Sequence, residues 1–352
     1  MSIEQYLQEV PKAELHVHLE GSVRPNTLLT LAKRNAISLP AESVEGLQQW
    51  FTFRDFEHFI QIYLAISHCL KRAEDYELIV YEFAEEMARQ HVRYAEVTFS
   101  PATHQFALGV PFDVYFAGLT RGRERAYQDF NVEINWVFDI VRNTCHELGV
   151  SKEADYTLSV AKEGMANGVV ALGLGGSEVG HPPEWFARWF EQAKNIGLHS
   201  VPHAGEVVGP ESVWEAIKTL NAERIGHGVR SAEDPHLLEY LAEKGLPLEV
   251  NPTSNIALGV YPNYQHHSLP TLLAAGIPIT INSDDPPLFN TTLNNEVSLL
   301  HSAFHLDLAT INDILLNGVR YSFLPTVHKA ELITQFEQEL LQLQARYHLG
   351  TN

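Results

Sequence analysis

Strand-like and helix-like segments alternate along most of the chain, and this alternation constrains the fold more than any other feature. Short apolar or alternating runs are typical of strands, and segments with helical periodicity follow most of them. The expected strands are residues 14–18, 92–100, 132–141, 169–176, 198–203, 224–227, 246–251 and 277–282. Eight such units in 352 residues predict an α/β protein, a (β/α)8 TIM barrel.

Two regions outside this alternation are expected to add helices to the barrel. Residues 25–91, after the first strand, have mostly helical periodicity, and the segment from residue 309 onward is helical and charged. The sequence has no linker-like or low-complexity stretch and no internal repeat. We therefore expect residues 1–352 to form a single domain.

Composition limits the partners and the compartment. The formal net charge of −20 disfavours binding to nucleic acid and to anionic membranes. We expect no membrane span, because no run approaches ~18 apolar residues. The first residues resemble no signal peptide, and two cysteines, Cys69 and Cys145, form no CxxC motif. A cytoplasmic location is expected; the oligomeric state stays open.

Two histidines fall on one face of the first expected strand. Residues 13–18 alternate in polarity, so His16 and His18 point to the same side. An exposed edge strand is the alternative, but the apolar residues on the opposite face argue against it. Neighbouring buried imidazoles need a partner, and a metal ion is a common one.

Further metal-ligating and acid–base residues follow later strands. They are His203 with Glu206, then His227, then Asp284 with Asp285. In a parallel barrel the strand ends meet at one edge. Three imidazoles and one carboxylate would suit zinc, with water or substrate completing the shell. The other acid–base groups would then serve proton transfer, although each alone could be an ordinary polar contact.

Aromatic residues between positions 43 and 72 have two interpretations. Phe56, Phe59, Ile60 and Tyr63 follow helical spacing, which usually means packing. The alternative is an apolar wall or lid over a flat aromatic substrate. Phe56 and Phe59 are the candidates for substrate contact.

Six segments resemble the adenosine deaminase family of the amidohydrolase superfamily. They occur in the order that the family has, between residues 11 and 290. They are residues 15–22 (LHVHLEGS), 175–178 (GGSE), 203–206 (HAGE), 224–229 (RIGHGV), 252–255 (PTSN) and 283–286 (SDDP).

This resemblance implies the metal and the reaction. It implies one zinc ion per chain, held by His16, His18, His203 and Asp284. Water activated by the zinc would attack C6 of a small-molecule 6-aminopurine, so that ammonia leaves and a 6-oxopurine remains. Glu206 would protonate N1, and His227 would orient the water, take up its proton and stabilise developing charge. Asp285 would bond N7, and the backbone of Gly176 would approach N3.

The substrate side departs from adenosine-specific members. Those members often carry aspartate after the histidine pair, where it holds the ribose 5′-hydroxyl; this chain has Glu20. Residues 177–183 resemble adenine-type members, residues 224–227 resemble nucleoside deaminases, and residues 282–296 resemble deaminases of larger derivatives. The default expectation is adenosine or deoxyadenosine, in purine salvage. The alternative is aminodeoxyfutalosine in menaquinone biosynthesis, free adenine, or an N6-substituted adenine.

Two other classes of function fit the sequence less well. Many amidohydrolases that cleave esters or amides use two metals bridged by a modified lysine, but residues 169–176 contain no lysine. The zinc motif of cytidine deaminases is absent. A barrel that only binds purine predicts loss of Glu206 or His227, and the chain has both.

Overall fold

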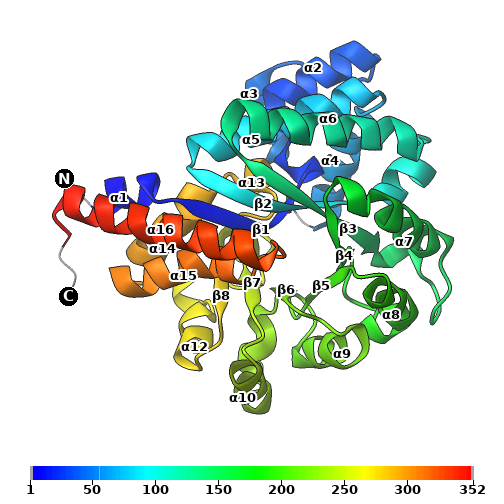
Figure 1. Ribbon diagram of the computed structural model, residues 1–352. Helices are drawn as coiled ribbons and strands as arrows, with labels where there is room; N and C mark the ends of the chain where they lie inside the picture. Colours follow the sequence, from blue (N-terminus) through cyan, green and yellow to red (C-terminus); the bar gives the residue numbers. More distant parts are fainter. Residues whose placement is uncertain (1–2, 55, 350–352) are drawn as a thin grey trace.

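The computed structural model describes residues 3–54 and 56–349, without the side chains of residues 56 and 57. Eight parallel strands pair in chain order from β1 to β8 (Figure 1). They are β1 (Lys12–His18), β2 (Val92–Phe99), β3 (Glu133–Val141), β4 (Val169–Gly175), β5 (His199–Ala204), β6 (Ile225–His227), β7 (Leu248–Val250) and β8 (Ile279–Ile281). The predicted TIM barrel is confirmed.

The backbone of Asp284 bonds to β1 where the barrel closes between β8 and β1. Its backbone N–H donates to the carbonyl of His16 at 3.1 Å, and its carbonyl accepts from His18 at 2.9 Å. Asp284 also forms an isolated parallel bridge with Val17. The closing contact of the sheet therefore holds Asp284 beside both histidines of β1.

Helices surround the strands, and the expected additions after β1 and at the C-terminal end are present (Figure 1). The last helix, α16, lies against α1. The helices are α1 (Ile3–Glu9), α2 (Pro25–Asn35), α3 (Val44–Phe51), α4 (Phe56–His68), α5 (Ala73–Arg89), α6 (Phe112–Phe130), α7 (Lys152–Gly164), α8 (Ala187–Asn195), α9 (Pro210–Leu220), α10 (Pro235–Lys244), α11 (Pro252–Ala257), α12 (Leu269–Ala274), α13 (Pro286–Phe289), α14 (Leu293–Ser302), α15 (Leu308–Arg320) and α16 (Thr326–Tyr347).

Local sequence explains many helix ends. The side chains of Ser151 and Asp307 accept backbone N–H bonds at the starts of α7 and α15. Asn131, with φ +55°, ends α6 in the left-handed conformation that asparagine tolerates. The short helices α11 and α13 were not predicted, because four to six residues show no helical periodicity.

The barrel interior holds both apolar and charged side chains. Val137, Ala171 and Val201 form a small buried cluster inside the strands. Arg224, directly before β6, is buried between Glu96 and Glu249. Within the described ranges, the helices lack the combination of length and apolarity that crossing a bilayer requires.

Candidate active site

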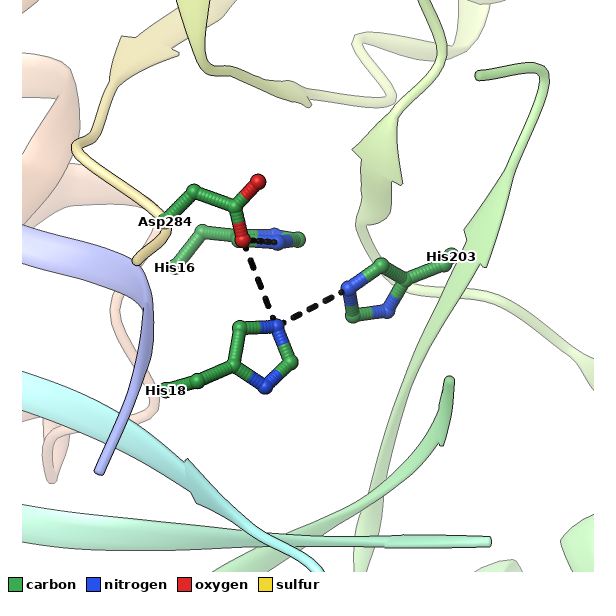
Figure 2. Close-up of side chains that lie close together, drawn as sticks. All are labelled: His16, His18, His203 and Asp284. Carbon is green, nitrogen blue, oxygen red and sulfur yellow. Dashed lines mark hydrogen bonds and ion pairs between the residues drawn. The ribbon is translucent and has the colours of Figure 1, made fainter. Parts of the chain in front are cut away.

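Four side chains converge at the edge of the barrel where the strands end (Figure 2). His16 and His18 come from β1, His203 from β5, and Asp284 from the turn after β8. One ligand atom of each lies within 4.8 Å of those of the others. Asp284 Oδ1 is 3.5 Å from His16 Nε2 and 3.4 Å from His18 Nε2, and His18 Nε2 is 3.3 Å from His203 Nε2. We call these four residues the His/Asp cluster.

The His/Asp cluster fits a zinc ion. Zinc bonds of 2.0–2.1 Å in a tetrahedron place neighbouring ligand atoms about 3.3–3.4 Å apart, close to the spacings found here. His16 Nε2 is buried and forms no hydrogen bond among the described residues, which is costly unless a partner binds there. Three imidazole nitrogens and one carboxylate oxygen also match the ligands that zinc prefers.

Neighbouring side chains orient the ligands. His16 Nδ1 lies 2.9 Å from Glu249 Oε2, and Arg224 Nε donates to Glu249 Oε1 at 2.6 Å. A hydrogen on Nδ1 leaves the Nε2 lone pair facing the cluster. Asp284 Oδ2 accepts a hydrogen bond of 2.6 Å from Ser254, so the other oxygen, Oδ1, faces the histidines.

Glu206 and His227 lie beside the cluster. Glu206 Oε1 is 3.7 Å from His227 Nδ1 and has no hydrogen-bond partner among the described residues. Burial, together with nearby carboxylates, raises the pKa of Glu206 to about 8. Burial lowers the pKa of His227 to about 3. Both shifts in pKa favour the uncharged form, of the Glu206 carboxyl and of the His227 imidazole.

Two asparagines define where the His227 ring carries its hydrogen. The amide nitrogens of Asn251 and Asn255 each lie 3.3 Å from His227 Nδ1. The Asn251 amide nitrogen also donates to a backbone carbonyl, and the Asn255 oxygen accepts from His267 Nε2, which fixes both amides. His227 Nδ1 is thus an acceptor, so its ring hydrogen is on Nε2, the nitrogen that faces Asp284.

Two glycines leave room for groups that can contact a ligand. Asp285 Oδ1 is buried without a hydrogen-bond partner among the described residues, and a methyl at Gly21 would lie 1.6 Å from it. Burial, followed by the charge of Asp284, raises the pKa of Asp285. Gly176 has φ +81°, and a methyl there would lie 2.6 Å from Asn143 Oδ1.

A cavity of about 340 Å³ opens over these groups, within the range of small-molecule sites (~300–1,000 Å³). Glu206, Asp285 and Gly176 line it. A larger hollow of about 760 Å³ beside α3 and α13 contains no residue of the His/Asp cluster. The smaller cavity is therefore the candidate active site.

The apolar wall of the cavity comes from α4. Phe59 and Tyr63 line it, and the Phe59 ring stacks on Phe289 with 5.5 Å between centroids. Phe59 thus lies at the cavity, and its contact with a substrate stays a prediction. The side chain of Phe56 lies outside the described residues.

Glu20 occupies a different place from the one expected for a sugar-binding residue. Its side chain is fully buried and does not line the cavity. One carboxylate oxygen lies 2.9 Å from His104 Nε2, and the other accepts from the Tyr63 hydroxyl at 3.1 Å. These bonds hold the carboxylate behind Tyr63, and its contact with a substrate stays a prediction.

Asp139 lines the same cavity and was missed in the sequence. It extends from β3 and accepts a hydrogen bond of 2.6 Å from Ser100. Burial raises the pKa of its carboxyl group to about 6. A signal existed, since Asp139 is the only charged residue among residues 134–141.

The comparisons with known proteins agree with this geometry. Residues 11–339 match the protein family described as adenosine deaminase. An aminodeoxyfutalosine deaminase of Streptomyces coelicolor is 42% identical over 94% of this chain and 85% of its own length. An adenine deaminase of Cupriavidus necator is 36% identical over 96% of this chain and 94% of its own. An amidohydrolase from Burkholderia ambifaria, solved with bound Zn, has a TM-score of 0.89 at 25% identity, covering 99% and 96%.

A parallel barrel with a His/Asp cluster at the ends of its strands defines a hydrolase of the amidohydrolase class. Within that class, the chain belongs to the adenosine deaminase family. It is an aminohydrolase that removes the amino group of aminopurines.

Proposed function

We propose that residues 1–352 act as one domain that deaminates a 6-aminopurine carrying a substituent on N9, with aminodeoxyfutalosine the first candidate. Free adenine, which lacks this substituent, is the competing candidate. The observation that carries this proposal is that the buried Glu206 carboxyl, whose Oε1 has no hydrogen-bond partner among the described residues, and the His/Asp cluster share one cavity. The 42% identity to an aminodeoxyfutalosine deaminase favours this alternative over the default expectation of adenosine.

The His/Asp cluster would hold one zinc ion per chain. When bound, zinc lowers the pKa of water enough to supply a nucleophile near neutral pH. The protein orients the cluster through Glu249 and Ser254. Asp284 belongs to both the barrel closure and the cluster, which fixes the position of its carboxylate.

Glu206 would act as the general acid. Attack at C6 puts electron density on the purine ring, and a proton delivered to N1 relieves it. The raised pKa keeps this carboxyl protonated at neutral pH. Its Oε1 has no hydrogen-bond partner among the described residues, so the group is available to the substrate.

His227 would donate a hydrogen bond from Nε2. Because the Asn255 amide donates to Nδ1, the neutral ring presents an N–H to the reaction centre. This N–H can orient the attacking water and stabilise charge that develops on its oxygen. The expected second role, as acceptor of the water proton, stays a prediction.

Asp285 and Gly176 would recognise the purine ring. The raised pKa leaves the Asp285 carboxyl able to donate to N7, a ring acceptor. The absence of a side chain at Gly176 allows the backbone to approach the opposite edge near N3. The flat apolar wall that Phe59 supplies suits an aromatic ring.

Asp139 and Ser100 give the cavity a polar region suited to hydroxyl groups of an N9 substituent. A free base offers no such groups. Among the described residues that line the cavity, none is lysine or arginine, while several are acidic. An acidic lining repels phosphate, so nucleoside monophosphates are disfavoured.

The test is a comparison of kcat/KM across 6-aminopurines, measured as ammonia release by the zinc-loaded protein. The panel contains aminodeoxyfutalosine, adenosine, deoxyadenosine, adenine and N6-methyladenine; for the last of these the leaving group is methylamine, which is measured in place of ammonia. The proposal predicts that aminodeoxyfutalosine leads. A lead by adenine, with the nucleosides inactive, would overturn the assignment of the N9 substituent.

A further inference from the structure

The loop that carries Glu206 is bound to one carboxylate of the neighbouring loop. Glu178, after β4, accepts three backbone N–H bonds from residues 205–208. The Gly205 N–H donates to Oε1 at 2.6 Å, and the N–H groups of Val207 and Val208 both donate to Oε2 at 2.8 Å. The bonded amides lie on both sides of Glu206, and hydrogen bonds to a charged acceptor are stronger than neutral ones.

The start of this loop is fixed from the same side. The buried guanidinium of Arg142 donates to the carbonyl of His203 and to that of His181, each at 2.5 Å. Arg142 therefore ties the last residues of β5 to the loop after β4. Glu178 and Arg142 together hold both ends of the short segment from His203 to Val208.

The loop after β6 holds the segment from the other side. The Gly228 N–H donates to the carbonyl of Ala204 at 3.0 Å, and the Arg230 N–H donates to that of Gly205 at 2.9 Å. Glu206 thus projects from a backbone that is bonded on both flanks, although the neighbouring Val207 side chain is 46% exposed. Such bonding limits the positions that the carboxyl can occupy.

We propose that Glu178 is a positioning residue that holds Glu206 in line with the purine ring. This inference rests on the proposed function of Glu206. Glu178 also lies two residues from Gly176, so the same short loop approaches the substrate and holds the acid. A purine seated against Gly176 would therefore find the Glu206 carboxyl at a fixed distance from N1.

The conservative substitution Glu178→Gln tests this role. Comparing it with a variant that loses the same charge elsewhere separates the role from a general effect of charge. Glutamine has one acceptor oxygen, and its NH₂ group would face a backbone N–H. It cannot satisfy both Gly205 and the Val207–Val208 pair. Glu184→Gln is the matched control, because it removes the same charge from an exposed position six residues away.

We expect Glu178→Gln to lower kcat about 10- to 100-fold, the effect of a displacement of about 1 Å, with KM and zinc content near wild type. Glu178→Asp keeps both oxygens and should recover part of the lost kcat. Glu184→Gln should match wild type. Unchanged kcat in Glu178→Gln, or a loss confined to KM, would overturn the proposal.

Amide hydrogen exchange tests the same bonds without an assay of activity. In the wild-type protein the amides of Gly205, Val207 and Val208 should exchange slowly, and Glu178→Gln should accelerate them while the core stays protected. If Glu178→Gln does not fold, Glu178→Asp is compared instead. Equally slow exchange in the folded variant would overturn the positioning role. A wild-type protein that deaminates no 6-aminopurine would instead overturn the proposed function.

Discussion

His16 Nδ1 lies 2.9 Å from Glu249 Oε2, and both side chains are buried. Glu249 is in turn bonded to Arg224, which also contacts Glu96. The charged interior of the barrel therefore ends at a residue of the His/Asp cluster. This connection explains why one ring orientation of His16 is favoured before any metal binds.

Replacing Glu249 should weaken metal binding. Glu249→Gln keeps the shape of the side chain but removes the charge that orients His16, and we expect about 10- to 100-fold lower zinc affinity. Zinc retention is measured by titration with a competing chelator. Glu239→Gln, at an 82% exposed side chain, is the control and should bind zinc like wild type. Equal affinity in both variants would contradict the role of Glu249.

Replacing Glu206 should remove the acid and leave the metal in place. We expect Glu206→Gln to lower kcat by about 10²- to 10⁴-fold, the usual contribution of a general acid. Zinc content, measured by elemental analysis, should remain that of wild type, because Glu206 is not in the His/Asp cluster. Near-normal turnover in this variant would refute the assignment.

Replacing Asp139 should change substrate preference. Asp139→Asn removes the charged acceptor while Ser100 keeps an oxygen to bond. For a substrate with a hydroxylated N9 substituent, kcat/KM should fall about 10-fold, whereas activity on adenine should change little. The two substrates measured on the same preparation serve as each other's control. Equal losses of kcat/KM on both substrates would show that Asp139 does not determine substrate preference.

Adding one methyl group at Gly21 should disturb Asp285. A Cβ there would lie 1.6 Å from Asp285 Oδ1, so this carboxyl must move. We expect Gly21→Ala to lower kcat/KM about 10- to 100-fold, the cost of a lost hydrogen bond to a polar group, with zinc retained.

The control for Gly21→Ala is Gly209→Ala, whose methyl would have the carboxylate of the exposed Glu211 as its nearest neighbour. That carboxylate can rotate away, so kinetic constants should match wild type. If Gly21→Ala also behaves like wild type, Asp285 has no part in binding the purine.

The strands and the His/Asp cluster could be predicted because each follows from a local pattern. Alternation places His16 and His18 on one face, and parallel strands in a barrel bring their ends together. The same pattern brings the strand ends near His203 and Asp284 together, although they are 81 residues apart in the chain. The choice of these two residues over His227 and Asp285 as ligands came from the resemblance to the family.

Partners that depend on long-range packing could not be predicted. Glu20 pairs with His104, 84 residues away on an unpredicted turn, and this bond removes Glu20 from the cavity. Glu178 stood out only as part of a motif, because its three backbone partners depend on the shape of the loop after β5. The position of a buried carboxylate depends on its donors, and the local sequence does not reveal them.

The most direct test of the proposed function measures ammonia release as a function of zinc content. The protein is stripped with a chelator, reloaded with increasing zinc, and assayed with aminodeoxyfutalosine at each step. We predict that ammonia release is lost in the stripped protein, returns in proportion to the zinc added and saturates at one ion per chain. Full ammonia release by the stripped protein, or none from any 6-aminopurine after reloading, would contradict this prediction.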